Sequence, residues 1–347
     1  AGRNTCGVFD ITPMTKHRIL GPDAEAFLNR LVTRDVRKIK PGRVGYAVWC
    51  DDEGRVIDDG TIFHLGIGDY RVCSQEHQID WLMINARGFD MDIVEDTHDV
   101  AGLALQGPTS AAVLRQMGIK EVEELTPFGL VQIDWEGGKL TLSRTGFTGD
   151  LGYELWVDPD KAETLWDQLF EAGKLLGIKA MGSDALEMLR IEAGYILAAT
   201  DFSPVMHTVR PRNTRSPFEL GLGWLVDFKK PVFNGRAALM REQQKGSRYA
   251  LVKLDIEDNK AAHHSYVYDT RERQIGWGTS ALWSPSAKKN IALATVKTPH
   301  GKVGEKMVVE VYYQRELAWN RKMAKAVVVK DPFWDPPRRR LTPPADF

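Results

Sequence analysis

The chain has 347 residues, with 46 Lys and Arg against 47 Asp and Glu, a hydrophobic share of 43% and a charged share of 27%. These proportions are ordinary for a soluble globular protein with two or three domains. The near-zero net charge argues against nonspecific nucleic-acid binding. No apolar run approaches the roughly 18 residues of a membrane span, so neither nucleic acid nor membrane is expected as a partner. Three cysteines without metal-ligand spacing and no visible signal peptide predict a cytoplasmic protein.

The first 200 residues predict helices interspersed with strands. Apolar side chains recur on one stripe after Pro22-Asp23, and Gly118 and Gly177 follow two further apolar stripes. The predicted helices cover residues 23–32, 109–117, 161–176 and 184–198. Segments that alternate or run apolar predict strands at 44–50, 56–65, 70–74, 90–95, 140–143 and 153–157.

The remaining sequence changes character twice. Residues 200–218 contain three prolines, three arginines and one histidine without periodicity, which predicts a loop. Beyond about residue 245 the pattern is β-rich with short turns, and the Pro- and Arg-rich end is expected to lie extended over the surface. The mixture predicts an α+β body followed by an all-β domain.

Two adjacent carboxylates, Asp58 and Asp59, lie near the start of the otherwise apolar strand 56–65. A charge that enters a hydrophobic run costs free energy unless it is paired or used. Neighbouring residues of a strand point to opposite faces, so one carboxylate faces the interior and the other the exterior. The spacing does not say which one, and it is also compatible with an acidic turn over 51–54 that solvates the start of the strand.

Glu192 holds a similar position on the helix predicted over 184–198. It lies three residues from Leu189 and four from Ile196, so its carboxylate shares a stripe with apolar side chains. A carboxylate on a buried face needs a partner. That partner is either an internal base such as Arg190 or a ligand whose N–H groups a carboxylate accepts as a fork.

Ordered blocks along the chain carry a family resemblance. They include Gly-Val-Phe-Asp-Ile-Thr-Pro-Met at 7–14, Pro-Gly-Arg-Val-Gly-Tyr at 41–46, Ala-Leu-Gln-Gly-Pro at 104–108, Ser-Arg-Thr-Gly-Phe-Thr-Gly at 143–149 and Leu-Arg-Ile-Glu-Ala-Gly at 189–194. In this order the blocks resemble the glycine-cleavage T-protein (aminomethyltransferase) family between about residues 7 and 334. The chain enters the family pattern partway in, so an N-terminal aromatic-rich segment of that pattern is expected to be missing.

The resemblance implies a three-domain, aminomethyltransferase-like α+β fold around a central folate channel, with a C-terminal all-β barrel. Residues 1–240 would form a folate-binding core of two intertwined α+β subdomains, 241–334 the barrel, and 335–347 an extended tail. The implied cofactor is tetrahydrofolate. Glu192 would hold the pterin, Asp58 would be the catalytic carboxylate near the reactive nitrogens, and Tyr46 and Arg236 would contact the folate. Asp59 also matches the family pattern, so the two aspartates could exchange roles.

Two departures from the family pattern bear on the substrate. An arginine-bearing loop over 201–217 replaces a short acidic segment, and Cys73-Ser74-Gln75 replaces a family asparagine. Both indicate the branch that transfers a methyl group from a small molecule to tetrahydrofolate. The candidate contacts to the methyl donor are His207, Arg210, Arg212, Arg215 and Ser74. The alternative for the loop is a solvated basic surface.

The predicted function is therefore a tetrahydrofolate-dependent methyltransferase acting as a demethylase, with an aryl methyl ether, a sulfonium or a methylated amine as small-molecule donor. One alternative is the aminomethyltransferase of glycine cleavage, which requires a lipoyl carrier protein. The other is a non-catalytic folate-binding assembly factor, ranked last because the signature of that group is replaced at 144–149. No metal site is predicted, since no His-Glu-x-x-His motif occurs and His263-His264 lies in a polar turn.

Overall fold

The computed structural model describes residues 1–345 and divides into two compact units. Unit 1 comprises residues 1–49 and 58–186 together with the C-terminal segment from Asp335. Unit 2 comprises residues 50–57 and 187–334. Residues 187–240 thus cluster with the barrel segment, and the domain boundaries inferred from the sequence stay a prediction. No helix among the described residues is long and apolar enough to cross a membrane.

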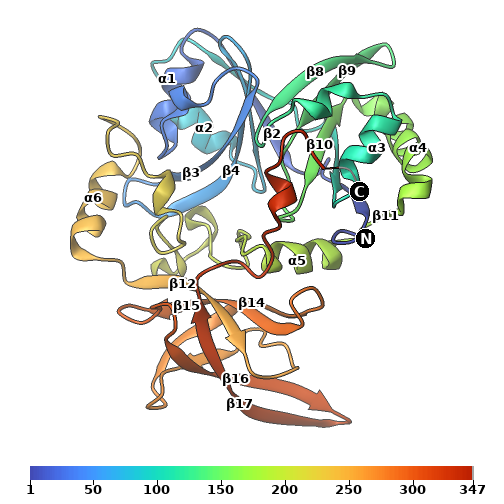
Figure 1. Ribbon diagram of the computed structural model, residues 1–347. Helices are drawn as coiled ribbons and strands as arrows, with labels where there is room; N and C mark the ends of the chain where they lie inside the picture. The colour runs from blue at the N-terminus through green and yellow to red at the C-terminus, as the bar shows by residue number, and fades with distance from the viewer. Residues whose placement is uncertain (346–347) are drawn as a thin grey trace. The chain divides into compact units, whose positions relative to one another are not determined.

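Unit 1 contains two sheets (Figure 1). Their strands are β1 (Cys6–Asp10), β2 (Thr15–Leu20), β3 (Arg43–Cys50), β4 (Val56–Gly66), β5 (Asp69–Ser74), β6 (Asp92–Glu95), β7 (Ala101–Gln106), β8 (Leu130–Trp135), β9 (Gly138–Ser143), β10 (Gly152–Val157) and β11 (Ile178–Ala180). The helices are α1 (Ala24–Leu31), α2 (Ile79–Asn85), α3 (Ser110–Gln116), α4 (Ala162–Gly173) and α5 (Ser183–Glu192), the last of which runs into unit 2. Short 3₁₀ turns are Val36–Lys38, Lys120–Glu123, Pro159–Lys161, Lys174–Leu176 and Pro337–Arg339.

The core of unit 1 lies on both faces of the six-stranded sheet, whose order is β11-β1-β7-β10-β9-β8. On one face, leucines of β7 and β10 pack with leucines of α3 and α4. The other face meets the five-stranded sheet, of order β3-β4-β5-β2-β6, through a cluster that includes Phe9, Phe63 and Trp156. The rings of Phe63 and Trp156 meet edge to face at 5.8 Å. Both faces of the six-stranded sheet are therefore covered, and its strand β7 is buried along its whole length.

Unit 2 contains a closed barrel and the chain that leads into it. The barrel strands, in the order β12-β15-β14-β13-β16-β17, are β12 (Tyr249–Ile256), β13 (Tyr266–Tyr268), β14 (Gln274–Ser284), β15 (Lys289–Lys297), β16 (Lys306–Arg315) and β17 (Ala318–Val329). Before them come helix α6 (Arg236–Lys245) and the 3₁₀ turns Val205–His207, Pro211–Asn213 and Gly223–Leu225. The barrel interior is filled by small and branched side chains, among them Ala294, Val309 and Val328. The predicted α+β class with a C-terminal all-β barrel is confirmed.

The helix predicted over 184–198 is too long. Helix α5 ends at Glu192, and Gly194 follows with a positive φ of 74°. The amide of Gly194 donates to the carbonyl of Ile191 at 3.0 Å, which closes the helix with a left-handed residue. Ile196 is therefore not on the helical stripe, whereas Leu189 is.

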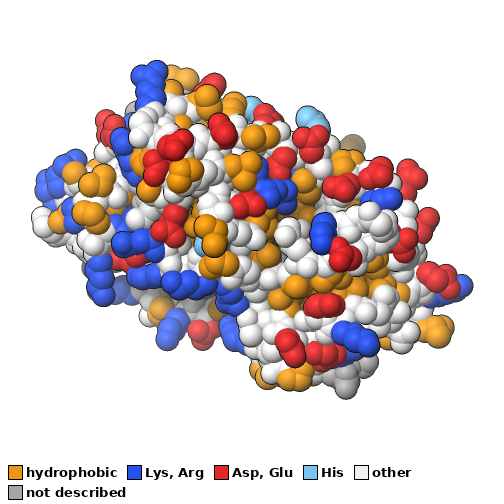
Figure 2. Space-filling model, turned by 90° about the horizontal axis from the view of Figure 1, so that it is seen from above, with side chains coloured by type: hydrophobic (Ala, Val, Ile, Leu, Met, Phe, Trp, Pro, Cys, Tyr) orange, Lys and Arg blue, Asp and Glu red, His pale blue; other side chains and the backbone are white. Residues whose placement is uncertain are grey.

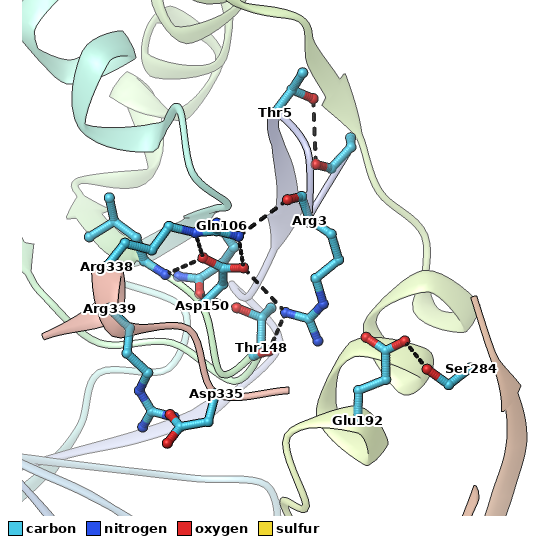
Figure 3. Close-up of polar contacts among 12 residues, drawn as sticks. Arg3, Thr5, Gln106, Thr148, Asp150, Glu192, Ser284, Asp335, Arg338 and Arg339 are labelled. Carbon is cyan, nitrogen blue, oxygen red and sulfur yellow. Dashed lines mark hydrogen bonds and ion pairs between the residues drawn. The ribbon is translucent and has the colours of Figure 1, made fainter. Parts of the chain in front are cut away.

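The C-terminal segment is fixed to unit 1 by ionic contacts rather than lying loosely over its surface (Figure 3). The guanidinium of Arg338 binds both carboxylate oxygens of buried Asp150, at 2.7 and 2.8 Å. Arg3 approaches the same carboxylate at 3.6 Å. On the face drawn in Figure 2, Lys and Arg side chains gather in a band at the lower left, whereas Asp and Glu side chains are scattered over the rest of the face.

Candidate active site

The carboxylate pair on β4 is divided between interior and surface as strand alternation requires. Asp58 has 0% of its surface exposed, whereas Asp59 is partly exposed. The Oδ1 atom of Asp58 accepts the backbone N–H of Asp59 at 2.9 Å, and its Oδ2 atom accepts the N–H of Glu76 at 3.2 Å. Close approach of β4 and β5 allows this contact, since a Cβ on Gly60 would lie 2.2 Å from the carbonyl oxygen of Cys73.

The buried carboxyl group of Asp58 has a strongly perturbed pKa. Burial is the largest cause, and the negative charge of Asp59 adds to it; together they raise the pKa of Asp58 from 3.8 to about 8. The hydrogen bonds from the two backbone amides act in the opposite direction without cancelling the shift. Asp58 can therefore donate or accept a proton near neutral pH, which an exposed aspartate cannot do.

Tyr46 lies on β3 and contacts the other member of the pair. Its hydroxyl group donates to Oδ2 of Asp59 at 2.6 Å. Tyr46 is partly exposed rather than packed in the core. The two aspartates thus differ in environment, because Asp59 is stabilised by a phenol and Asp58 by backbone amides.

In unit 2, Glu192 ends helix α5 with only 1% of its surface exposed (Figure 3). Its Oε1 atom accepts the hydroxyl of Ser284 at 2.6 Å. Arg190, the internal base considered from the sequence, directs its guanidinium to Glu187 and Asp201 at 2.9 and 2.6 Å. The carboxylate of Glu192 therefore has a neutral hydroxyl partner in Ser284, while the guanidinium of Arg190 binds other carboxylates.

Asp201 is a buried carboxylate that the sequence analysis assigned only to a loop. Its oxygens accept the guanidinium of Arg190, the hydroxyl of Ser280 at 2.7 Å and the backbone N–H of Leu197 at 2.9 Å. The side chains of Arg190 and Asp201 are both fully buried. This network ties the end of α5 to barrel strand β14, and no periodic signal in the loop could have revealed it.

The candidate donor-binding residues of the loop do not share one environment. His207, Arg210 and Arg212 are exposed. Arg215 has 2% of its surface exposed, and its guanidinium lies over the rings of Tyr249 at 4.3 Å and Trp277 at 5.3 Å. For Arg215 the solvated-loop alternative is wrong, because its charge is stabilised by two aromatic faces and by backbone carbonyls.

A cavity of about 450 Å³ lies beside this loop in unit 2. Arg212 and Lys297 contribute positive charge to its wall. The remaining lining residues are Asn213, Tyr249, Tyr266, Gln274, Gly276 and Trp277. Cationic and aromatic groups together suit a small anionic or carboxylate-bearing ligand.

Two further predicted contacts have internal partners. The guanidinium of Arg236 donates to the carbonyls of Lys230 at 2.9 Å and Phe228 at 3.1 Å, which engages two of its nitrogens in unit 2. Ser74 is buried at the end of β5, and its hydroxyl donates to the carbonyl of Glu76 at 3.1 Å. Ser74 thereby shapes the segment whose amide binds Asp58, and a ligand contact for either residue stays a prediction.

Glu154 on β10 is a titratable carboxyl group within the strand predicted over 153–157. Its Oε2 atom accepts the hydroxyl of Thr145 at 2.7 Å. Desolvation raises the pKa of Glu154 to about 7, and the Thr145 bond opposes that shift. The signal available in the sequence was a carboxylate in the alternating strand 153–157, the same kind of signal that identified Asp58.

The fold and the buried carboxylates define a class of enzymes that transfer one-carbon units with tetrahydrofolate. The family description "GCVT N-terminal domain" matches residues 1–230, and "Glycine cleavage T-protein C-terminal barrel domain" matches residues 250–335. The chain therefore belongs to the glycine-cleavage T-protein family, whose enzymes use tetrahydrofolate as one-carbon acceptor. The family expected from the sequence is confirmed.

Individual relatives carry two different names. An aminomethyltransferase of Halothermothrix orenii is 33% identical over 315 residues, covering 90% of this chain and 85% of that protein. A trimethylamine-oxide aldolase of Ruegeria pomeroyi is 35% identical over 353 residues, covering 98% of this chain but only 43% of that protein. The glycine cleavage aminomethyltransferase T of Bartonella henselae shares the fold, with a TM-score of 0.84 at 24% identity over 96% of this chain and 88% of that one.

Proposed function

We propose that the chain is a tetrahydrofolate-dependent methyltransferase that takes a methyl group from a small methylated donor and transfers it to N5 of tetrahydrofolate. The observation that carries the proposal is the buried Asp58 carboxyl group with a pKa of about 8. Transfer of a methyl group to a secondary amine releases one proton, and a group that exchanges protons near neutral pH can accept it.

The residues present fit the cofactor of the family. The pterin of tetrahydrofolate presents adjacent N–H donors, and a buried carboxylate such as Glu192 accepts such a pair as a fork. The hydroxyl of Ser284 donates to Oε1 of Glu192 at 2.6 Å and so orients this carboxylate. When bound, tetrahydrofolate supplies a nucleophilic nitrogen that accepts the one-carbon unit. Tyr46 and Arg236 are the further proposed contacts of this cofactor.

Asp58 is proposed as the proton acceptor. At pH 7 a group with a pKa of about 8 is ionised in roughly one molecule in ten, and the ionised share rises to one half at pH 8. The backbone N–H groups of Asp59 and Glu76 donate hydrogen bonds that stabilise the ionised carboxylate of Asp58. Turnover should therefore increase with pH up to about 8 if Asp58 acts as a base.

The donor is proposed to be a methylated amine, a sulfonium or an aryl methyl ether. The relative named trimethylamine-oxide aldolase supports including methylated amines and their oxides. A quaternary ammonium or sulfonium donor releases a neutral amine or sulfide without acid help, whereas an aryl methyl ether releases a phenolate, which gains from a nearby cation. His207, Arg210, Arg212 and Arg215 are the proposed source of that cation or of a carboxylate contact, with Ser74 as a further candidate. The proposed location of the protein is the cytoplasm.

The test is a panel of methylated amines, amine oxides, sulfonium compounds and aryl methyl ethers incubated with the chain and tetrahydrofolate. Formation of 5-methyltetrahydrofolate from one class, with a much lower turnover in Asp58→Asn at unchanged tetrahydrofolate affinity, is the expected result. Equal loss of turnover and affinity in that variant would count against a proton-transfer role.

Most of the relatives are named aminomethyltransferase, which favours one second candidate function. The same assay discriminates it when an aminomethyl-loaded lipoyl carrier protein replaces the methyl donor. Release of ammonia with this carrier, and no product from the donor panel, would overturn the demethylase proposal and support the glycine-cleavage activity.

A further inference from the structure

Three potential metal ligands gather at one edge of the five-stranded sheet in unit 1. His17 on β2 is directly paired with Glu95 on the antiparallel strand β6, so both side chains leave the same face of the sheet. His77 lies three residues beyond the end of β5, which borders β2 on the other side. One ligand atom from each of the three residues lies within 4.8 Å of the other two.

His17 has no hydrogen-bond partner within the described chain, although it is deeply buried. Only 1% of its surface is exposed, and neither Nδ1 nor Nε2 makes a hydrogen bond to any described residue. Leaving a buried polar group unpaired costs about 1–3 kcal/mol, so such groups in native proteins usually bind something. The imidazole ring of His77 meets that of His17 edge-on, with the ring centres 5.8 Å apart.

The two outer ligands are already associated with each other. Nε2 of His77 lies 3.0 Å from Oε2 of Glu95, and both side chains are exposed. The next residue on β6, Asp96, is excluded from the donor set because it pairs with Arg71 at 2.8 Å.

We propose that His17, His77 and Glu95 bind one divalent transition-metal ion of the zinc type, with a fourth position open to solvent. Two imidazole nitrogens and one carboxylate oxygen suit zinc and its neighbours better than calcium or magnesium, which prefer oxygen alone. Bonds of about 2.0–2.2 Å place the ligand atoms of a tetrahedral site about 3.4 Å apart. The exposed His77 and Glu95 close the remaining distance by side-chain rotation, while packing holds His17 in place.

The proposal departs from the expectation of no metal, because these ligands follow no local sequence motif. They come from β2, the segment after β5 and β6, and only the sheet brings them together. An ion at this position would also fix the segment that carries Glu76, whose backbone N–H donates to Asp58. The site is separate from the donor chemistry, so its test does not depend on the proposed function.

The experiment is calorimetric titration of the metal-free full chain with Zn²⁺, repeated with Co²⁺ and followed by visible absorption. The variants are His77→Ala and Glu95→Gln, both at exposed positions where folding is retained. The matched control is His300→Ala. His300 bonds to Glu305 at 2.7 Å in a comparable pair, and within residues 1–345 no third ligand completes that pair.

One ion per chain is expected in the wild type and in His300→Ala, with a tetrahedral Co²⁺ spectrum. Each ligand variant should weaken Zn²⁺ binding at least tenfold and lose that spectrum. Zn²⁺ should also raise the melting temperature of the wild type but not of His77→Ala. Absence of stoichiometric binding in the wild type, or equal affinity in the wild type and both ligand variants, would overturn the proposal.

Discussion

Replacing Asp58 by Asn should change how the stability of the protein depends on pH. In the folded chain burial raises the pKa of Asp58 to about 8, against 3.8 for an unperturbed aspartate. Between pH 5 and 7 the unfolded chain therefore carries the ionised group and the folded chain the protonated one. Unfolding releases one proton over this window, so the contribution of Asp58 to stability decreases as the pH rises.

The magnitude follows from one proton over two pH units. Each unit corresponds to about 1.36 kcal/mol, so the free energy of unfolding of the wild type should decrease by about 3 kcal/mol relative to Asp58→Asn between pH 5 and 7. The difference should level off above pH 8, where the folded group is also ionised. Asn reproduces the shape of the neutral acid and can still accept the N–H of Glu76, while it no longer titrates.

The assay is urea unfolding of both proteins at half-unit pH steps, followed by circular dichroism. Asp52→Asn provides the control, since Asp52 is exposed in the turn before β4 and its removal should leave the pH dependence unchanged. Groups that do not interact with Asp58 cancel in the difference between the compared proteins. Parallel curves for the wild type and Asp58→Asn over pH 5–7 would show that the carboxyl group is ionised in the folded state and refute the reasoning.

Three further predictions follow from single side chains. Glu192→Ala should weaken tetrahydrofolate binding by about 100-fold, roughly 3 kcal/mol, with an unchanged circular dichroism spectrum, and Ser284→Ala should cost less; wild-type affinity in Glu192→Ala, measured by calorimetry, would refute the pterin contact. Arg210→Ala and Arg212→Ala should raise the Michaelis constant for the methyl donor without altering tetrahydrofolate affinity, and unchanged kinetics in both would leave these positions as solvated surface. Asp201→Ala should lower the free energy of unfolding by about 3–5 kcal/mol, because it removes the fully buried carboxylate that pairs with the guanidinium of Arg190 and leaves that charge with the more exposed Glu187; a loss below about 1 kcal/mol in urea titrations would contradict that.

Strand alternation was the most informative local signal, and the structure shows its limit. The alternation on β4 predicts that one of Asp58 and Asp59 is buried. It cannot say which, because that depends on which face of the strand the neighbouring sheet covers. In the structure Asp58 is the buried member of the pair, and its carboxylate accepts the backbone N–H of Glu76. Glu154 also lies in an alternating strand, but a single carboxylate there is ordinary when its surroundings are unknown. The sequence alone therefore does not identify it as a buried, titratable group.

The apolar stripe correctly predicted a buried position for Glu192, but the helix predicted over 184–198 is too long. Glu192 is buried as predicted, but α5 ends there and Ile196 lies beyond it. The sequence analysis also treated Arg210, Arg212 and Arg215 as one group, because composition alone does not distinguish their surroundings. Arg215 differs from the exposed Arg210 because it is buried against rings of β12 and β14, which are far away in the sequence. Helices α2 and α6 were missed because the first is very short and the second is mostly polar.

By itself the sequence determined the family, the mixed α+β class, the C-terminal barrel and the positions of several strands, although it missed β1, β2 and β7 inside the two sheets of unit 1. These follow from local periodicity and from ordered motifs, which are properties of neighbouring residues. Only the tertiary structure decided which carboxylates lose water, which arginine lies against aromatic rings and which histidines meet a glutamate across a sheet. Burial and ligand geometry depend on residues that are distant along the chain, so they become definite only when the strands have paired.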